Sequence, residues 1–296
     1  MKRIFYFNVT YTCNSSCTFC YSHNTIHSGV VHNEIEIEQF VEYLRRHNVG
    51  KHDRVIINGG EPFLHSNIIG ILKSLKKIGC ETLIYTNGRR LFQYDLSFLD
   101  KHYRFVIPVH GHEKLHDSIT KIKSSFAEMI KSFDYIKTLD CLIDVKVIVN
   151  NVMASNEIEV ERTLLVLDQL PINHAVHITK MADTIISHKN NCPSVTHRQA
   201  ARCTKTFFNF YVSKNLKIKI FDTCVKLLCL DDNILCMDCP DAQVFFKDNA
   251  HEWNFECYTP VLECRSSCEK SRFCYSAVSN YNVLEYSNGK LYKGFE

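Results

Sequence analysis

Three cysteines near the start of the chain have the spacing of metal ligands. Cys13, Cys17 and Cys20 stand in the segment Cys-Asn-Ser-Ser-Cys-Thr-Phe-Cys, a C-x-x-x-C-x-x-C pattern. Three thiolates on one short loop can bind three irons of a 4Fe-4S cluster and leave the fourth iron open to another ligand. A zinc site that takes its fourth ligand from a distant residue fits the same cysteines.

A second motif, Asn58-Gly59-Gly60-Glu61-Pro62, follows the next β-rich run of the sequence. Two adjacent glycines let the backbone approach a ligand closely, and the proline fixes the turn that follows. The motif can therefore cradle the amino group of a bound amino acid. A plain strand-to-helix turn is the alternative interpretation.

Short β-rich runs alternate with amphipathic helical segments over the first 180 residues, which is typical of a parallel sheet with crossover helices. The predicted strands are 4–10, 54–58, 82–87, 104–109, 143–149 and 174–180. Six such units predict an α/β fold, a partial (β/α)6 TIM-like barrel. Both motifs follow strands, and chemistry in such folds collects at the carboxyl ends of the strands.

Capping pairs and a glycine predict the helix ends. The pairs are Asn33 with Glu36, Ser125 with Glu128 and Asn156 with Glu159. Gly79 is predicted to end a helix over residues 68–78.

Composition narrows the class of protein. The chain has 296 residues, of which 45% are apolar, and its net charge of +3 is too balanced to indicate nucleic-acid binding. Its apolar runs are too short for a membrane span or a signal peptide, so we expect a cytoplasmic protein.

The 15 cysteines are an odd number and ten of them follow residue 190, which favours metal ligands over disulfides. Cys80 and Cys141 stand apart and are predicted to be buried and inert.

The two motifs in their strand contexts resemble the signature of the radical S-adenosylmethionine (SAM) superfamily. The resemblance covers residues 4 to about 180 and includes Thr86-Asn87-Gly88 and the stretch from His116-Asp117 to Ser125-Phe126. It implies that Cys13, Cys17 and Cys20 ligate a 4Fe-4S cluster whose open iron binds SAM. Reductive cleavage of SAM would then give a 5′-deoxyadenosyl radical that abstracts a hydrogen atom from substrate. The residues expected at the cofactor are Phe19, Gly59, Gly60, Glu61, Pro62, Thr86, Asn87 and, from its place after the fourth strand, His110.

The cysteine-rich region from residue 191 to 296 resembles the auxiliary-cluster extensions of that superfamily called twitch and SPASM domains. The chain is accordingly divided into a core domain, 1–190, and a small auxiliary iron–sulfur domain, 191–296, with a hairpin expected around 207–221. The match departs from the usual pattern, because the pair Cys264-x-x-x-Cys268 replaces C-x-x-C and no cysteine follows Cys274. A structural zinc site fits these cysteines equally well. The expected ligands of one or two auxiliary clusters are Cys203, Cys224, Cys264, Cys268 and Cys274.

Family analogy implies an enzyme that modifies a ribosomally made peptide or protein. A small-molecule dehydrogenase or epimerase in antibiotic or cofactor synthesis is the alternative, and a zinc-bound structural or nucleic-acid module stands outside the enzyme class. The expected reductant is a flavodoxin or a ferredoxin. Because the first predicted strand begins near residue 4, we expect no leader-binding domain ahead of the barrel, and a separate protein or the barrel itself would then recruit a peptide.

Overall fold

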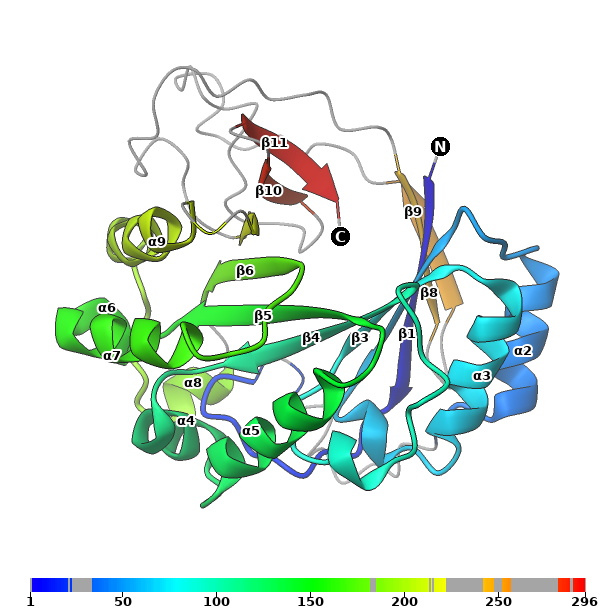
Figure 1. Cartoon of the computed structure of the whole chain (residues 1–296), viewed down its shortest axis with the longest axis horizontal. Helices are drawn as coiled ribbons and strands as arrows, with labels where there is room; N and C mark the ends of the chain where they lie inside the picture. Colours follow the sequence, from blue (N-terminus) through cyan, green and yellow to red (C-terminus); the bar gives the residue numbers. More distant parts are fainter. Residues whose placement is uncertain are drawn as a thin grey trace.

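The computed structural model describes residues 2–20, 22, 34–181, 185–212, 214, 216–221, 242–247, 252–256, 282–287 and 290–295. One sheet organises them, with the strand order β11-β10-β7-β6-β5-β4-β3-β2-β1-β8-β9 (Figure 1). No helix in the described part of the chain is long and apolar enough to cross a membrane.

Adjacent strands from β1 to β7 are parallel. Their bounds are β1 Lys2–Thr10, β2 Arg54–Gly59, β3 Glu81–Tyr85, β4 Tyr103–Val109, β5 Leu142–Val149, β6 Ala175–Lys180 and β7 Lys217–Phe221. The six predicted strands and the α/β partial-barrel fold are therefore confirmed.

Strands from the C-terminal region extend the sheet at both edges. β8 (Ala242–Lys247) pairs parallel with β1, and β9 (Glu252–Glu256) pairs antiparallel with β8. At the other edge β10 (Asn282–Ser287) pairs antiparallel with β7 and with β11 (Lys290–Phe295). The division at residue 190 stays a prediction.

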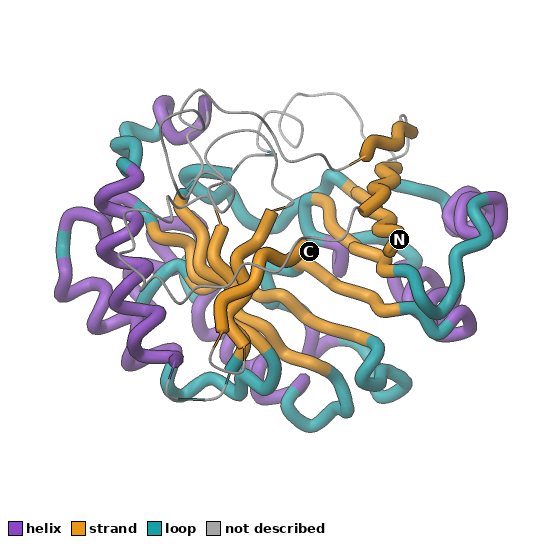
Figure 2. Tube along the Cα trace, turned by 90° about the horizontal axis from the view of Figure 1, so that it is seen from above, coloured by secondary structure: helices purple, strands orange, loops and turns teal. Residues whose placement is uncertain are grey.

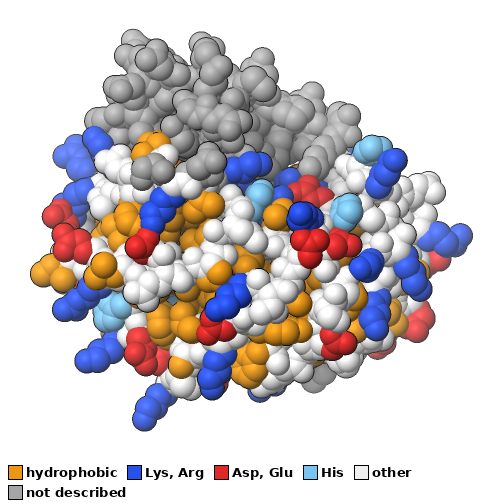
Figure 3. Space-filling view, viewed as in Figure 1, with side chains coloured by type: hydrophobic (Ala, Val, Ile, Leu, Met, Phe, Trp, Pro, Cys, Tyr) orange, Lys and Arg blue, Asp and Glu red, His pale blue; other side chains and the backbone are white. Residues whose placement is uncertain are grey.

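Helices flank the strands of the sheet on the left and on the right in Figure 2. They are α2 Ile37–Arg46, α3 Ile68–Ile78, α4 Glu113–Thr120, α5 Ser125–Ile136, α6 Asn151–Ser155, α7 Glu157–Leu167, α8 Ile185–Lys189 and α9 His197–Val212, with short 3-10 turns η1 Pro62–Leu64 and η2 Leu91–Gln93. On the face shown in Figure 3, basic and acidic side chains are intermixed.

The hairpin expected around residues 207–221 is wrong. Residues up to Val212 belong to α9, and only Lys217–Phe221 form a strand. Ala200, Phe207 and Tyr211 are buried at helical spacing, so the period of this apolar stripe outweighs its aromatic β-propensity.

Alternation along the strands gives the sheet two different faces. On β1, Phe5, Phe7 and Val9 join the apolar core, while the intervening Tyr6 and Asn8 stay half-buried. The second face also carries buried charge farther along the sheet.

Charged side chains on this second face have hydrogen-bonding partners. Arg54 and Arg104 both donate to Glu81, and Asp144 accepts from His174 Nδ1 at 2.7 Å and His177 Nε2 at 2.8 Å. Burial raises the pKa of Asp144, but the two imidazoles outweigh it and hold the pKa well below its ordinary value. Ions in a dry interior are tolerated when they are paired in this way.

The predicted helix ends are correct in part. Gly79 ends α3 in the left-handed conformation with φ 71°, as predicted. Asn156 caps α7 by accepting from Ile158 N at 3.1 Å. Asn33 lies outside the described residues.

The capping pair of Ser125 with Glu128 is wrong, because the cap of α5 comes from a residue of the preceding helix. Asp117 of α4 accepts from Ser124 N at 2.7 Å, from Phe126 N at 2.8 Å and from Ser125 Oγ at 2.9 Å. One carboxylate thus satisfies backbone donors at the start of α5 and ties α4 to α5.

Asp117→Ala should lower the free energy of unfolding by about 1–2 kcal/mol, because it leaves the first amides of α5 without an acceptor. Urea denaturation followed by circular dichroism measures this change. Asp134→Ala is the matched control, since among the described residues Asp134 of α5 forms an exposed pair with Lys137 and should cost less than about 0.5 kcal/mol. Equal losses in the two variants would contradict the capping role.

Candidate functional site

The cysteine loop after β1 is held by backbone hydrogen bonds to the end of α4. Ser16 N donates to Thr120 O at 3.0 Å and Thr18 N donates to Ile119 O at 2.9 Å. Asn190, just after α8, donates from Nδ2 to Thr18 O at 3.0 Å. The loop therefore has a fixed path although it carries no helix or strand, and the segment after β1 runs beside α4 and α8 in Figure 1.

The three cysteine thiols of this loop are half-buried and influence one another. Burial, with a contribution from Cys20, raises the pKa of Cys13 to about 11. Burial, with contributions from Cys20 and Cys13, raises the pKa of Cys17 to about 12. A metal centre would have to displace protons from these thiols, as metal thiolate sites do. Three neighbouring sulfur donors on one wrapping loop fit an iron–sulfur cluster.

The glycine turn after β2 lies directly against the cysteine loop. Gly60 N donates to Thr10 O at 2.7 Å and Glu61 N donates to Thr12 O at 2.8 Å. A Cβ on Gly59 would lie 2.1 Å from Thr10 O, and one on Gly60 would lie 2.4 Å from Thr12 O. Glycine is required at both positions because two backbones approach closely, and Gly59 also has φ +153°.

The Glu61 carboxylate is fully buried and joins the loops after β2 and β3. It accepts from Thr86 Oγ1 at 2.6 Å, from Asn87 N at 2.7 Å and from Phe63 N at 3.0 Å. Burial raises the pKa of Glu61, while these three donors and Arg89 oppose that shift. The side chain is thus largely occupied by protein donors, and Pro62 follows it as the first residue of η1.

The loop after β3 in turn reaches the cysteine loop. Asn87 Nδ2 donates to Asn14 Oδ1 at 2.7 Å, and the Arg89 guanidinium donates to Asn14 O. Arg89 also pairs with Glu128 of α5 at 2.7 Å. Sequence reasoning did not place Asn14, Arg89 or Glu128 at this site. The one available signal was a basic residue directly after Thr-Asn-Gly.

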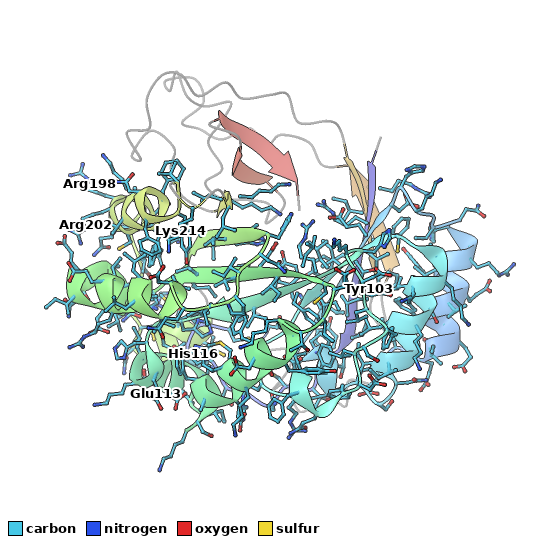
Figure 4. The ribbon with its side chains drawn as sticks, in the orientation of Figure 1. Tyr103, Glu113, His116, Arg198, Arg202 and Lys214 are labelled. Carbon is cyan, nitrogen blue, oxygen red and sulfur yellow. The ribbon has the colours of Figure 1, made fainter. Side chains whose placement is uncertain are left out.

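A ring contact links the cysteine loop to the end of β4. The Phe19 ring is 5% exposed and meets the His110 ring edge-on at a centroid distance of 5.5 Å. His110 N donates to Nδ1 of His116, which α4 presents beside the sheet (Figure 4). Burial lowers the pKa of His110 well below its ordinary value and that of His116 to about 4, so both imidazoles are neutral near pH 7. Nδ1 of His110 is buried and has no hydrogen-bond partner within the described residues.

Hydrogen bonds therefore connect the three loops through Gly60, Glu61, Thr86 and Asn87, and Phe19 packs against His110. Cys80 and Cys141 are buried, as predicted. Cys203 is buried in α9, where Sγ donates to Met153 O at 3.5 Å. The other expected auxiliary ligands, Cys224, Cys264, Cys268 and Cys274, lie outside the described residues.

A family model and a curated relative match parts of this sequence. The family model of the radical SAM superfamily matches residues 7–177. A curated relative, 7-carboxy-7-deazaguanine synthase from Halobacterium salinarum, is 30% identical over 76 residues, which make up 26% of this chain and 28% of the relative.

Solved structures share the fold at low sequence identity. Streptococcus suis SuiB bound to precursor peptide SuiA is similar with a TM-score of 0.59 at 15% identity, over 75% of this chain and 49% of SuiB. Native anSMEcpe with bound AdoMet and Cp18Cys peptide is similar with a TM-score of 0.53 at 13% identity, over 72% of this chain and 60% of that protein. The chain thus spans about half the length of SuiB.

Gly60→Ala should destabilise the protein by about 1–3 kcal/mol or more, because the added methyl group overlaps backbone carbonyls that have little room to move. Thermal unfolding measures the loss. Gly50→Ala is the matched control, since a Cβ at Gly50 meets no atom within 4 Å. If Gly60→Ala unfolded like Gly50→Ala, the close approach of the two loops would be refuted.

Proposed function

Because the chain belongs to the radical SAM superfamily, we propose that it binds a 4Fe-4S cluster and SAM at the three loops after β1, β2 and β3 and modifies a ribosomally made peptide or protein. The observation that carries this proposal is the joining of the cysteine loop to the Gly-Gly-Glu turn by backbone hydrogen bonds. When bound, the cluster and SAM supply a 5′-deoxyadenosyl radical by reductive cleavage of SAM.

The chain's own residues bind and orient these groups. In this proposal Cys13, Cys17 and Cys20 ligate the cluster. The residues that hold SAM are Phe19, Gly59, Gly60, Glu61, Pro62, Thr86, Asn87 and His110. The Glu61 carboxylate accepts from three protein donors, so in this proposal it holds the loops after β2 and β3 in place. The buried ring of Phe19 excludes water beside the cysteine loop.

The peptide substrate is supported by the solved structures with similar folds. SuiB was solved with precursor peptide SuiA, and anSMEcpe with Cp18Cys peptide. The proposal also includes a separate protein that recruits the peptide and a flavodoxin or ferredoxin as the reductant. It places the enzyme in the cytoplasm. We assign residues 1–190 to the radical SAM core and residues 191–296 to an auxiliary domain of the twitch or SPASM kind, with one or two further clusters.

A small-molecule reaction is the second candidate, and a specific observation favours it. The curated relative with 30% identity is a 7-carboxy-7-deazaguanine synthase, although the match covers only 28% of it. Product analysis by mass spectrometry with candidate peptides and with small heterocyclic acids would separate the two substrate classes.

Cys17→Ala should abolish formation of 5′-deoxyadenosine, because the cluster would lose one of its three ligands. The measurement is anaerobic reconstitution with iron and sulfide, followed by incubation with SAM and dithionite. Cys141→Ala is the matched control, since Cys141 is a buried cysteine beside Ile136 O and should leave product formation unchanged. Undiminished 5′-deoxyadenosine from Cys17→Ala would contradict the assignment of Cys17 as a ligand. Purification of the wild-type chain as a colourless zinc protein would contradict the proposed function.

His110→Phe should weaken SAM binding by up to about tenfold, because Nδ1 would no longer be available to a polar group of the ligand. Phenylalanine keeps the ring against Phe19. Isothermal titration of the reconstituted protein with SAM measures the affinity. His102→Phe, at a side chain that is 61% exposed, is the control. Equal affinities for wild type and His110→Phe would exclude His110 from the SAM site.

A further inference from the structure

Arg89 occupies a position that the signature motifs do not account for. Its side chain is only 11% exposed, and Nη1 donates to the backbone carbonyl of Asn14 and approaches Ser15 Oγ at 3.4 Å. Both acceptors lie between Cys13 and Cys17, so the guanidinium contacts the cysteine loop itself.

The Glu128 carboxylate forms an ion pair with this guanidinium. Glu128, in the first turn of α5, accepts from Arg89 Nε at 2.7 Å and is 31% exposed. The backbone of Arg89 is fixed as well, because its amide donates to Asn87 Oδ1 at 3.0 Å. The guanidinium is therefore held between the loop and α5 by contacts on three sides.

The charge of Arg89 lies beside the proposed ligands. Its guanidinium donates to Asn14 O and approaches Ser15 Oγ, and these two residues directly follow Cys13 in the loop. A fixed positive charge near a partly buried site stabilises added negative charge there, since few water molecules screen it. Net charge and hydrogen bonds around an iron–sulfur cluster are among the factors that set its reduction potential.

We propose that the Arg89–Glu128 pair positions the cysteine loop and tunes the reduction potential of the cluster bound there, with Arg89 favouring the reduced state and Glu128 opposing it. This inference rests on the proposed function. One electron enters the cluster from a flavodoxin-type donor, or from dithionite in vitro, and makes it one unit more negative. No bond forms or breaks in the protein during this step.

Four variants distinguish an effect of the Arg89 charge on the cluster from a role in holding the cysteine loop in place. Arg89→Met removes the charge, Arg89→Lys keeps it but loses the forked hydrogen bonds, and Glu128→Gln removes the opposing carboxylate. Arg90→Met is the matched control, because Arg90 is the exposed neighbour in the same turn. The midpoint potential of each reconstituted protein is measured by potentiometric titration followed by electron paramagnetic resonance.

At a fixed potential, Arg89→Met should lower the ratio of reduced to oxidised cluster about tenfold, which corresponds to about 59 mV for a one-electron couple. Glu128→Gln should raise this ratio severalfold. Arg89→Lys should stay closer to wild type than Arg89→Met does, and Arg90→Met should not differ from wild type. A merely structural role would not shift the midpoint potential in opposite directions in Arg89→Met and Glu128→Gln. It would instead lower the iron content of every variant at Arg89 or Glu128.

Hydrogen exchange in the protein without its cluster provides a second readout. The amides of Ser16 and Thr18 donate to the end of α4, so faster exchange in Arg89→Met would support the positioning role. The inference would be overturned if the midpoint potential shifted in the same direction in Arg89→Met and Glu128→Gln, or in neither, provided that the cluster of the wild-type protein can be reduced. If the wild-type protein held no reducible cluster, the proposed function itself would fail.

Discussion

The close approach of two loop backbones is the constraint on which the rest of the site depends. The amides of Gly60 and Glu61 donate to carbonyls of Thr10 and Thr12, and no Cβ fits between the chains. β1 and β2 are already parallel neighbours, so these bonds continue the pairing past the ends of the strands into the loops. The cysteine loop thereby starts from a fixed backbone rather than from a free strand end.

Further hydrogen bonds carry this order from one loop to the next. Glu61 joins the loop after β2 to Thr86 and Asn87 after β3, and Asn87 returns to Asn14 in the cysteine loop. The three loops therefore form a closed circuit at one edge of the sheet. A circuit of this kind limits the freedom of each side chain before any ligand arrives, which reduces the entropy lost on binding.

Local sequence patterns predicted the parts of the structure that local interactions determine. The six strands follow from short apolar runs bounded by turn residues, and Gly79 and Asn156 were recognised because their capping bonds reach only a few residues along the chain. The pairing of Ser125 with Glu128 failed because both residues have other partners. Glu128 binds Arg89, 39 residues away, and the cap of α5 comes from Asp117. Contacts such as Arg89 with Asn14 depend on which loops the sheet brings together, and no sequence period encodes them.

The same circuit changes how the signature residues should be understood. Gly59 and Gly60 are required by the protein backbone alone, and the Glu61 carboxylate serves three protein donors. Substitutions at these positions would disturb the loops whether or not the residues touch a ligand, so loss of activity there does not identify a contact. His110 is more informative, because its buried Nδ1 has no hydrogen-bond partner among the described residues. A buried nitrogen without a hydrogen-bond partner destabilises the protein, and a bound polar group that bonds to the nitrogen removes this cost. Contact with a ligand is therefore better inferred from side chains that the protein leaves unsatisfied than from those it already uses.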